Sequence, residues 1–180
     1  MPDMTEPGSA LLHPDDCCLA FIDFSGPSGR PKEVIKAYRA ILQLAAKLSV
    51  PVLSAHRGGD SVGSEGSVPI DDLLENAVSG DGAFVRELIN PWTDNQFRQK
   101  VFEYDRARLV LAGGCSEGSL TQAALSALAD LYDVYIIFDL SDEKLNREAS
   151  PMAHRLIQSG VVPITARQLW LEWSEADSSG

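Results

Sequence analysis

The chain has 180 residues, of which 44% are hydrophobic and 23% charged, and its formal net charge is -11 at pH 7. These proportions are typical of one globular domain. The acidic balance argues against nucleic acid and membranes as partners, because both require clustered lysine and arginine. No stretch approaches the length of a membrane-spanning helix, and the first residues lack the pattern of a signal peptide. We therefore expect a cytoplasmic protein.

The pattern of apolar residues predicts strands that alternate with helices. The expected strands, in chain order, are residues 18–23, 51–55, 83–86, 109–112, 134–138 and 161–164. Segments with helical periodicity are 32–48, 70–78, a helix that Thr93 or Asp94 caps, 116–131 and the amphipathic stretch 141–159. The alternation predicts an α/β fold with three layers: a doubly wound, Rossmann-like sheet of six mostly parallel strands. Residues 17–173 would form this domain, with a flexible lead-in at 1–16 and a frayed tail at 174–180.

A glycine-rich segment follows the second strand. Residues 56–69, HRGGDSVGSEGSVP, contain four glycines and show no hydrophobic periodicity. The composition fits a surface loop beside an active site and fits a disordered insertion equally well. Both readings stay open.

The β-α-β unit at residues 108–140 carries the most informative turn. Gly113 to Ser119 follow a strand and begin a helix, which is where open α/β sheets place their ligand sites. The glycines do not match the dinucleotide pattern G-x-G-x-x-G, and they follow the fourth strand rather than the first. We therefore expect a small-molecule substrate at this turn and no nucleotide cofactor.

Neither a metal site nor a disulfide is predicted. Cys17 and Cys18 are adjacent and Cys115 stands alone, which fits neither a disulfide framework nor spaced pairs of zinc ligands. His56 and Asp60 lie four residues apart in a loop with no third ligand nearby, a pattern too weak to indicate a metal. We expect reduced thiols, no metal and no other cofactor.

Over residues 17–173 the order of parts resembles the isochorismatase-like superfamily, the cysteine hydrolases. In that family an aspartate ends the first strand, a basic residue, usually lysine, follows the third, and a nucleophilic cysteine begins the helix after the fourth. Asp23 and Arg86 stand in the first two positions, and Ser119 stands in the place of the cysteine. The residues Gly113, Ser116 and Glu117 fit the family pattern that precedes the nucleophile.

The chain is similar in particular to the branch of small oligomeric hydrolases that carries a Pro-Trp or Ala-Trp dipeptide after the third strand, here Pro91-Trp92. Arginine occurs in place of lysine in that branch, as at Arg86. The resemblance implies a substrate pocket that includes Phe24, His56 and Trp92. It also implies a homo-oligomer, and the apolar cluster around Trp170 and Trp173 suggests packing against another subunit.

The resemblance implies that Asp23 is an acid or base, with Arg86 keeping it charged or holding an anionic substrate. The alternatives are that Asp23 only caps a turn, and that Arg86 is a solvated residue paired with Glu87 or Asp81. Ser119 would lie in the first turn of a helix, where a thiol would ionise readily and a hydroxyl would not. We therefore favour Ser119 as a substrate contact or helix residue over a nucleophile.

In the family the peptide bond at Gly114-Cys115 is often cis, and the turn around Gly114, Cys115 and Ser116 supplies an oxyanion hole from backbone N–H groups. Cys115 is either a relocated nucleophile or a small residue that fills the turn.

Two functions follow as hypotheses. The first is a hydrolase of a small carbonyl, amide or enol-ether substrate, with Asp23 as the acid or base; true isochorismatases lack the cysteine and rely on acid catalysis by the aspartate. The second is a noncatalytic binding or assembly protein that has lost its nucleophile. A serine in the cysteine position is also a common engineered substitution.

Overall fold

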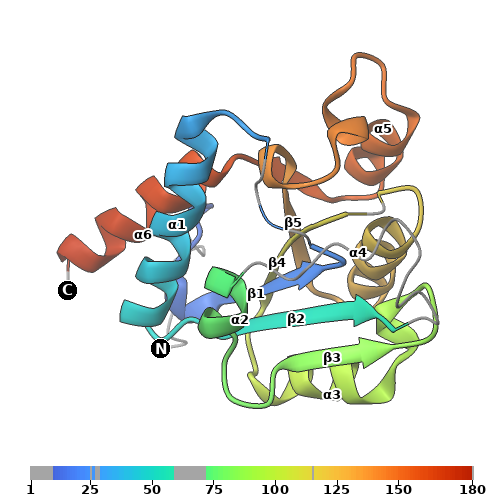
Figure 1. Ribbon diagram of the computed structural model, residues 1–180, viewed down its shortest axis with the longest axis horizontal. Coiled ribbons are helices and arrows are strands. Elements are labelled where there is room, and N and C mark those ends of the chain that lie inside the picture. The colour runs from blue at the N-terminus through green and yellow to red at the C-terminus, as the bar shows by residue number, and fades with distance from the viewer. Residues whose placement is uncertain (1–9, 25, 27–28, 59–71, 115, 180) are drawn as a thin grey trace, which may run out of the picture.

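A computed structural model describes residues 10–179 except 25, 27–28, 59–71 and 115. Its centre is a six-stranded parallel sheet with the order β3-β2-β1-β4-β5-β6 (Figure 1). The strands are β1 (Cys17–Ile22), β2 (Val52–Arg57), β3 (Ala83–Arg86), β4 (Arg108–Gly113), β5 (Asp133–Ile137) and β6 (Val162–Ile164). The predicted doubly wound α/β fold is confirmed, and every described strand pair is parallel.

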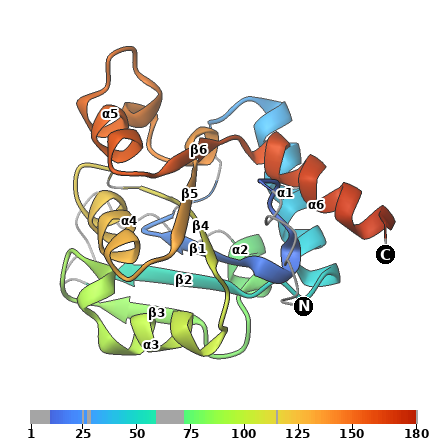
Figure 2. The ribbon, with the colours of Figure 1, turned by 180° about the vertical axis from the view of Figure 1, so that it is seen from behind.

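Helices cover both faces of the sheet, as Figures 1 and 2 show from opposite sides. One face carries α1 (Lys32–Lys47), α2 (Asp72–Ala77) and α6 (Ala166–Ser179), and the other carries α3 (Asn95–Glu103), α4 (Ser119–Ala129) and α5 (Pro151–Gln158). Asp94 caps α3, as predicted, because its Oδ1 accepts hydrogen bonds from the N–H groups of Gln96 and Phe97. Within the described residues, no helix combines the length and apolarity needed to cross a membrane.

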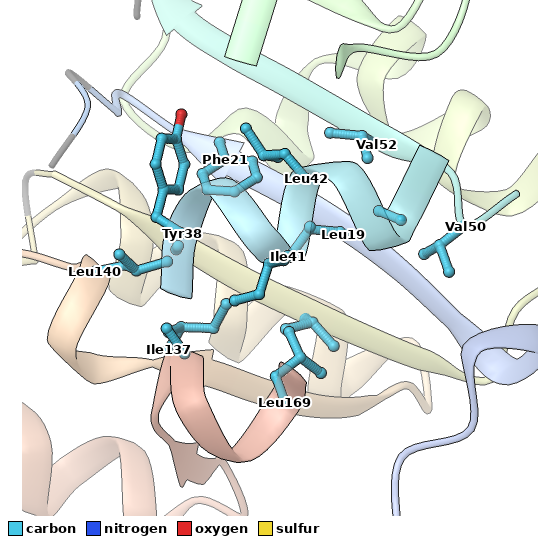
Figure 3. Packing of buried hydrophobic residues seen from close by; sticks show 14 of the residues in the cluster. Leu19, Phe21, Tyr38, Ile41, Leu42, Val50, Val52, Ile137, Leu140 and Leu169 are labelled. Atoms are coloured by element: carbon cyan, nitrogen blue, oxygen red, sulfur yellow. The ribbon is translucent and has the colours of Figure 1, made fainter. Parts of the chain in front are cut away.

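The core has two halves, one on each side of the sheet. Strand β1 is buried along its whole length, so its alternate side chains pack in opposite directions. Leu19 and Phe21 face Tyr38 and Ile41 of α1 (Figure 3), whereas Ala20 and Ile22 belong to the cluster that includes α3 and α4. The continuous apolar run that predicted this strand is therefore explained by burial on both faces.

Two expectations for the carboxyl-terminal third are corrected. The stretch 141–159 is not one amphipathic helix: a 3-10 turn at Glu143–Asn146 precedes α5, and α5 begins at Pro151 with Ser150 as its cap. Residues 174–179 continue α6 rather than fray, and there Lys47 of α1 donates a hydrogen bond to Asp177. The connection from β5 therefore turns sharply at the edge of the sheet.

Trp173 is also placed differently from the expectation. Its side chain is fully buried within its own chain, in the cluster formed with α1, so its burial does not require another subunit. The lead-in is likewise packed where it is described, because Leu12 is buried and its N–H donates to Glu172 over 2.6 Å. Helix α6 thus completes the core of a single chain.

The order of the strands reverses between β1 and β4, which makes this place the topological switch point of the sheet. The backbones of the two strands approach closely there. Ile22 is the register partner of Gly113, and the Gly114 N–H donates to the Ile22 carbonyl over 3.0 Å. A Cβ at Gly113 would fall on the Ile22 backbone, and one at Gly114 would lie 2.7 Å from the Asp23 carbonyl oxygen. Glycine is required because the turn must touch the end of β1.

We predict that Gly113→Ala lowers the free energy of unfolding by roughly 3 kcal/mol, because the clash is with backbone that cannot rotate away. Urea denaturation measures the change. The control is Gly58→Ala, whose Cβ would meet the Cγ1 of Val85, an exposed side chain that can rotate. Equal losses in the two variants would contradict the role given to the close approach.

Candidate functional site

Asp23 ends β1 at the carboxyl edge of the sheet, beside the switch point. Its φ is 46°, in the left-handed region that aspartate tolerates better than most residues. The Arg57 N–H donates to its Oδ1 over 2.9 Å, which fixes the carboxylate against the end of β2. The side chain remains 18% exposed, so the carboxylate is in contact with solvent. The strained backbone and the accessible carboxylate mark a candidate site.

Arg86 is the last residue of β3, and its side chain is only 1% exposed. Its Nη2 donates to Asp23 Oδ2 over 2.6 Å, and its Nη1 donates to the Leu88 carbonyl. The predicted alternative of a solvated arginine paired with Glu87 or Asp81 does not describe this side chain, because Asp81 pairs with Lys100 instead. The guanidinium therefore provides the buried positive charge that neutralises Asp23.

Ser119 begins α4 and is fully buried. Its hydroxyl donates to Asp23 Oδ2 over 2.6 Å, so the serine and the arginine share one carboxylate oxygen. First-turn N–H groups and the positive end of the helix dipole favour negative charge at this position. Asp23, Arg86 and Ser119, which the sequence placed on three different elements, thus meet within hydrogen-bond distance.

The expected oxyanion hole is not seen at two of its three residues. The Gly114 N–H donates to the Ile22 carbonyl, and the Ser116 N–H donates to Asp142 over 3.3 Å, so both donors are used within the protein. Cys115 lies outside the described residues, and with it the Gly114-Cys115 peptide bond. The first turn of α4 offers other backbone N–H groups for an anion.

Asp142 is the site residue that sequence reasoning missed. It follows β5, and its Oδ2 accepts hydrogen bonds from both the N–H and the hydroxyl of Ser116. The amphipathic reading of residues 141–159 treated it as one polar position of a helix. The rule that pointed to the turn at 113–119 could have found it, since Asp142 also follows a parallel strand at this edge of the sheet.

Two predicted pocket residues are not brought to this site. Phe24 is buried in the core, where its ring packs against Phe21 and Tyr38 at centroid distances of 4.8 and 5.4 Å. The Trp92 indole N–H donates to Asp130 over 2.6 Å, and this hydrogen bond lowers the pKa of the Asp130 carboxyl. Asp130 lies beyond the last residue of α4, roughly 16 Å along the helix from Ser119. Trp92 is therefore structural.

His56 lies near the site, one residue before the end of β2, and is half-buried. Burial lowers the pKa of its imidazole; the nearby Asp23 carboxylate opposes the shift and Arg86 adds to it. Its Nε2 is buried and has no hydrogen-bond partner among the described residues. The imidazole thus remains a candidate substrate contact. Within the same residues, no three His, Cys, Asp or Glu side chains are grouped to hold a metal ion.

No protein-family model matches the sequence, and no curated protein matches it significantly. Solved structures do match. The YcaC gene product of Escherichia coli, described as an octameric hydrolase of unknown specificity, has a TM-score of 0.78 at 20% identity, and the match covers 98% of this chain and 87% of that one. YcaC from Pseudomonas aeruginosa, solved with hexane-2,5-diol and covalent acrylamide, has a TM-score of 0.76 at 19% identity and covers 97% and 88%. An isochorismatase from Pseudomonas putida has a TM-score of 0.65 at 15% identity and covers 89% and 93%.

The molecule is thus a doubly wound α/β protein with a polar cluster at its switch point. Its fold is the one that these solved structures share, and the resemblance in sequence implied the same fold. The matches extend over most of each neighbour, at 15–20% sequence identity.

We predict that Trp92→Phe lowers the free energy of unfolding by about 1–2 kcal/mol, because it removes the hydrogen bond to Asp130 and some packing volume. Denaturation by urea gives the value. Asp130→Asn weakens the same contact from the other side and should also destabilise the protein. A change in substrate KM with Trp92→Phe, at unchanged stability, would restore the pocket role.

Proposed function

We propose that the chain is an isochorismatase-like hydrolase that cleaves a small carbonyl, amide or enol-ether substrate, with Asp23 as the acid or base. The observation that carries the proposal is the convergence of Ser119 Oγ and Arg86 Nη2 on Asp23 Oδ2, each at 2.6 Å. A carboxylate that accepts from a buried guanidinium and faces solvent is suited to proton transfer.

Among the described residues, the donors to Asp23 leave it one acceptor position for the reaction. An ionised carboxylate has about four acceptor positions, and Arg57, Arg86 and Ser119 donate to three of them. The remaining position lies on Oδ1, where a water or the substrate can donate its proton. In the proposed cycle Asp23 takes a proton from attacking water and returns it to the leaving group.

Arg86 and Ser119 orient the base rather than exchange protons. An arginine stays charged at any working pH, so it holds Asp23 without acting as an acid. A serine hydroxyl is a weak nucleophile because its pKa is high, and in the proposed cycle Asp23 takes its proton from water instead. Ser119 is fully buried, so its part is to direct the lone pairs of Asp23.

The second candidate is a binding protein without catalysis, and the observation that favours it is the same serine. A site in which the usual thiol is replaced by a buried hydroxyl keeps its shape and hydrogen bonds while it loses its nucleophile. The two candidates differ in whether Asp23 is needed for turnover.

The test is hydrolysis of a panel of small amides, esters and isochorismate; amides are included because YcaC from Pseudomonas aeruginosa was solved with covalent acrylamide. We expect Asp23→Asn to lower kcat at least 100-fold, on the order expected for a lost general acid or base. Ser119→Ala should keep most of the activity, because the serine does not attack.

The matched control is Asp133→Asn, an exposed aspartate at the start of β5 on the opposite edge of the sheet. It should be as active as the parent protein. Full activity of Asp23→Asn on any hydrolysed substrate would refute the acid or base role. Activity found only in Ser119→Cys would instead support the binding protein.

We further propose that the chain forms a homo-oligomer. Val85, Leu88 and Ile89, on edge strand β3 and just after it, are 75%, 59% and 46% exposed. Exposed apolar residues clustered at a sheet edge favour association. Escherichia coli YcaC, which has a similar fold, is described as octameric, and this supports an assembly of more than one chain.

Sedimentation velocity should therefore show an assembly larger than one 19.5 kDa chain. Leu88→Lys, which places a charge in this patch, should shift the distribution toward the monomer. Leu131→Lys is the control, because Leu131 is 91% exposed on the loop after α4. A monomeric parent protein at micromolar concentration would rule the proposal out.

A further inference from the structure

We infer that Asp142 is a positioning residue: it holds the turn between β4 and α4 and so determines where the side chain at position 119 lies. The inference rests on the proposed function, because it treats position 119 as part of the reaction site. It adds a residue from the far side of the switch point, on the connection after β5.

Asp142 is hydrogen-bonded to the turn at two places. Its backbone N–H donates to the Gly113 carbonyl over 2.9 Å, at the end of β4. Its Oδ2 accepts from the Ser116 N–H and the Ser116 hydroxyl over 3.3 and 3.0 Å. Ser116 is fully buried, so removal of the carboxylate would leave its N–H without this acceptor and its hydroxyl with only the Met152 sulfur, 3.5 Å away.

Asp142 and Ser116, the two partners in this contact, are each held by further hydrogen bonds. Oδ1 of Asp142 accepts from the Lys144 N–H over 3.0 Å and so caps the 3-10 turn at Glu143–Asn146. On the other side, the Thr121 hydroxyl of α4 donates to the Ser116 carbonyl over 2.5 Å. Ser116 is thus held between Asp142 and the first turn of α4, the turn that begins with Ser119.

The positioning role of Asp142 and its negative charge predict opposite effects on the stability of an anion at position 119. Burial raises the pKa of the Asp142 carboxyl, but hydrogen bonds from the Lys144 N–H and from Ser116 outweigh burial and lower the pKa overall. The group is therefore negative at neutral pH. By charge alone it would disfavour a second anion nearby, whereas by holding the helix start in place it favours one. Its removal can tell the two apart.

The experiment introduces a thiol at this position with Ser119→Cys, in a Cys115→Ser background, and follows the ultraviolet absorbance of the thiolate against pH, a readout that does not require a reagent to reach the buried position. Cys17 and Cys18 do not interfere, because burial raises the pKa of each thiol to about 12. Adding Asp142→Ala should raise the pKa of the introduced thiol by roughly half a unit to one unit, which lowers the thiolate fraction well below that pKa roughly three- to ten-fold.

Two further variants separate positioning from general destabilisation. Asp142→Asn keeps an acceptor oxygen for Ser116 and should leave the thiol pKa close to its value with Asp142 intact. Asp139→Ala makes the same chemical change nearby, where the carboxylate accepts from the Ala166 N–H at the start of α6, and it should leave the thiol pKa unchanged.

An unchanged or lowered thiol pKa in Asp142→Ala overturns the inference, since lowering is the result of lost charge alone. If that variant does not fold, Ser116→Ala removes only the hydroxyl donor; a smaller rise of the thiol pKa supports the inference and no rise overturns it. The measurement requires no turnover, so a chain without hydrolase activity still gives a clear result.

Discussion

The site depends on the close approach of two backbones at the switch point of the sheet. Ile22 and Gly113 are register partners, and the absence of side chains at Gly113 and Gly114 lets the turn after β4 lie against the end of β1. This approach carries Ser119 to Asp23. A larger residue at either glycine would separate the two groups even if every other contact were kept. The geometry of the polar cluster is therefore a consequence of backbone packing.

Asp23 is the centre of that cluster because it is the acceptor that two strands and a helix share. The donors come from the end of β2, the end of β3 and the start of α4. A buried arginine and a buried serine hydroxyl both need an acceptor, and one carboxylate oxygen serves both. The ion pair is costly to desolvate, so its partners stabilise the fold only as a complete set. A substitution of Asp23, Arg86 or Ser119 will therefore disturb the hydrogen bonds of the other two.

Much of this arrangement could be predicted from the sequence. The strands followed from short apolar runs, the turn at 113–119 followed from its glycines and the rule on strand ends, and Asp23, Arg86 and Ser119 followed from the resemblance to a known family. The failures share a physical cause, since each depends on a partner far away in the chain. Nothing local in the sequence shows that the Trp92 indole bonds to Asp130, or that Trp173 packs against α1. Asp142 was missed because an amphipathic pattern hides a break in the helix.

The two-sided contact of Arg86 links this residue to the backbone that follows it. Its guanidinium holds Asp23 with one nitrogen and the Leu88 carbonyl with another, as a planar fork allows. A lysine, the usual family residue, presents one compact ammonium and cannot keep both contacts in the same geometry. A lineage that exchanged lysine and arginine here would have to reshape residues 87–90 as well. Arg86 and the residues that follow β3 should therefore change together when the sequence diverges.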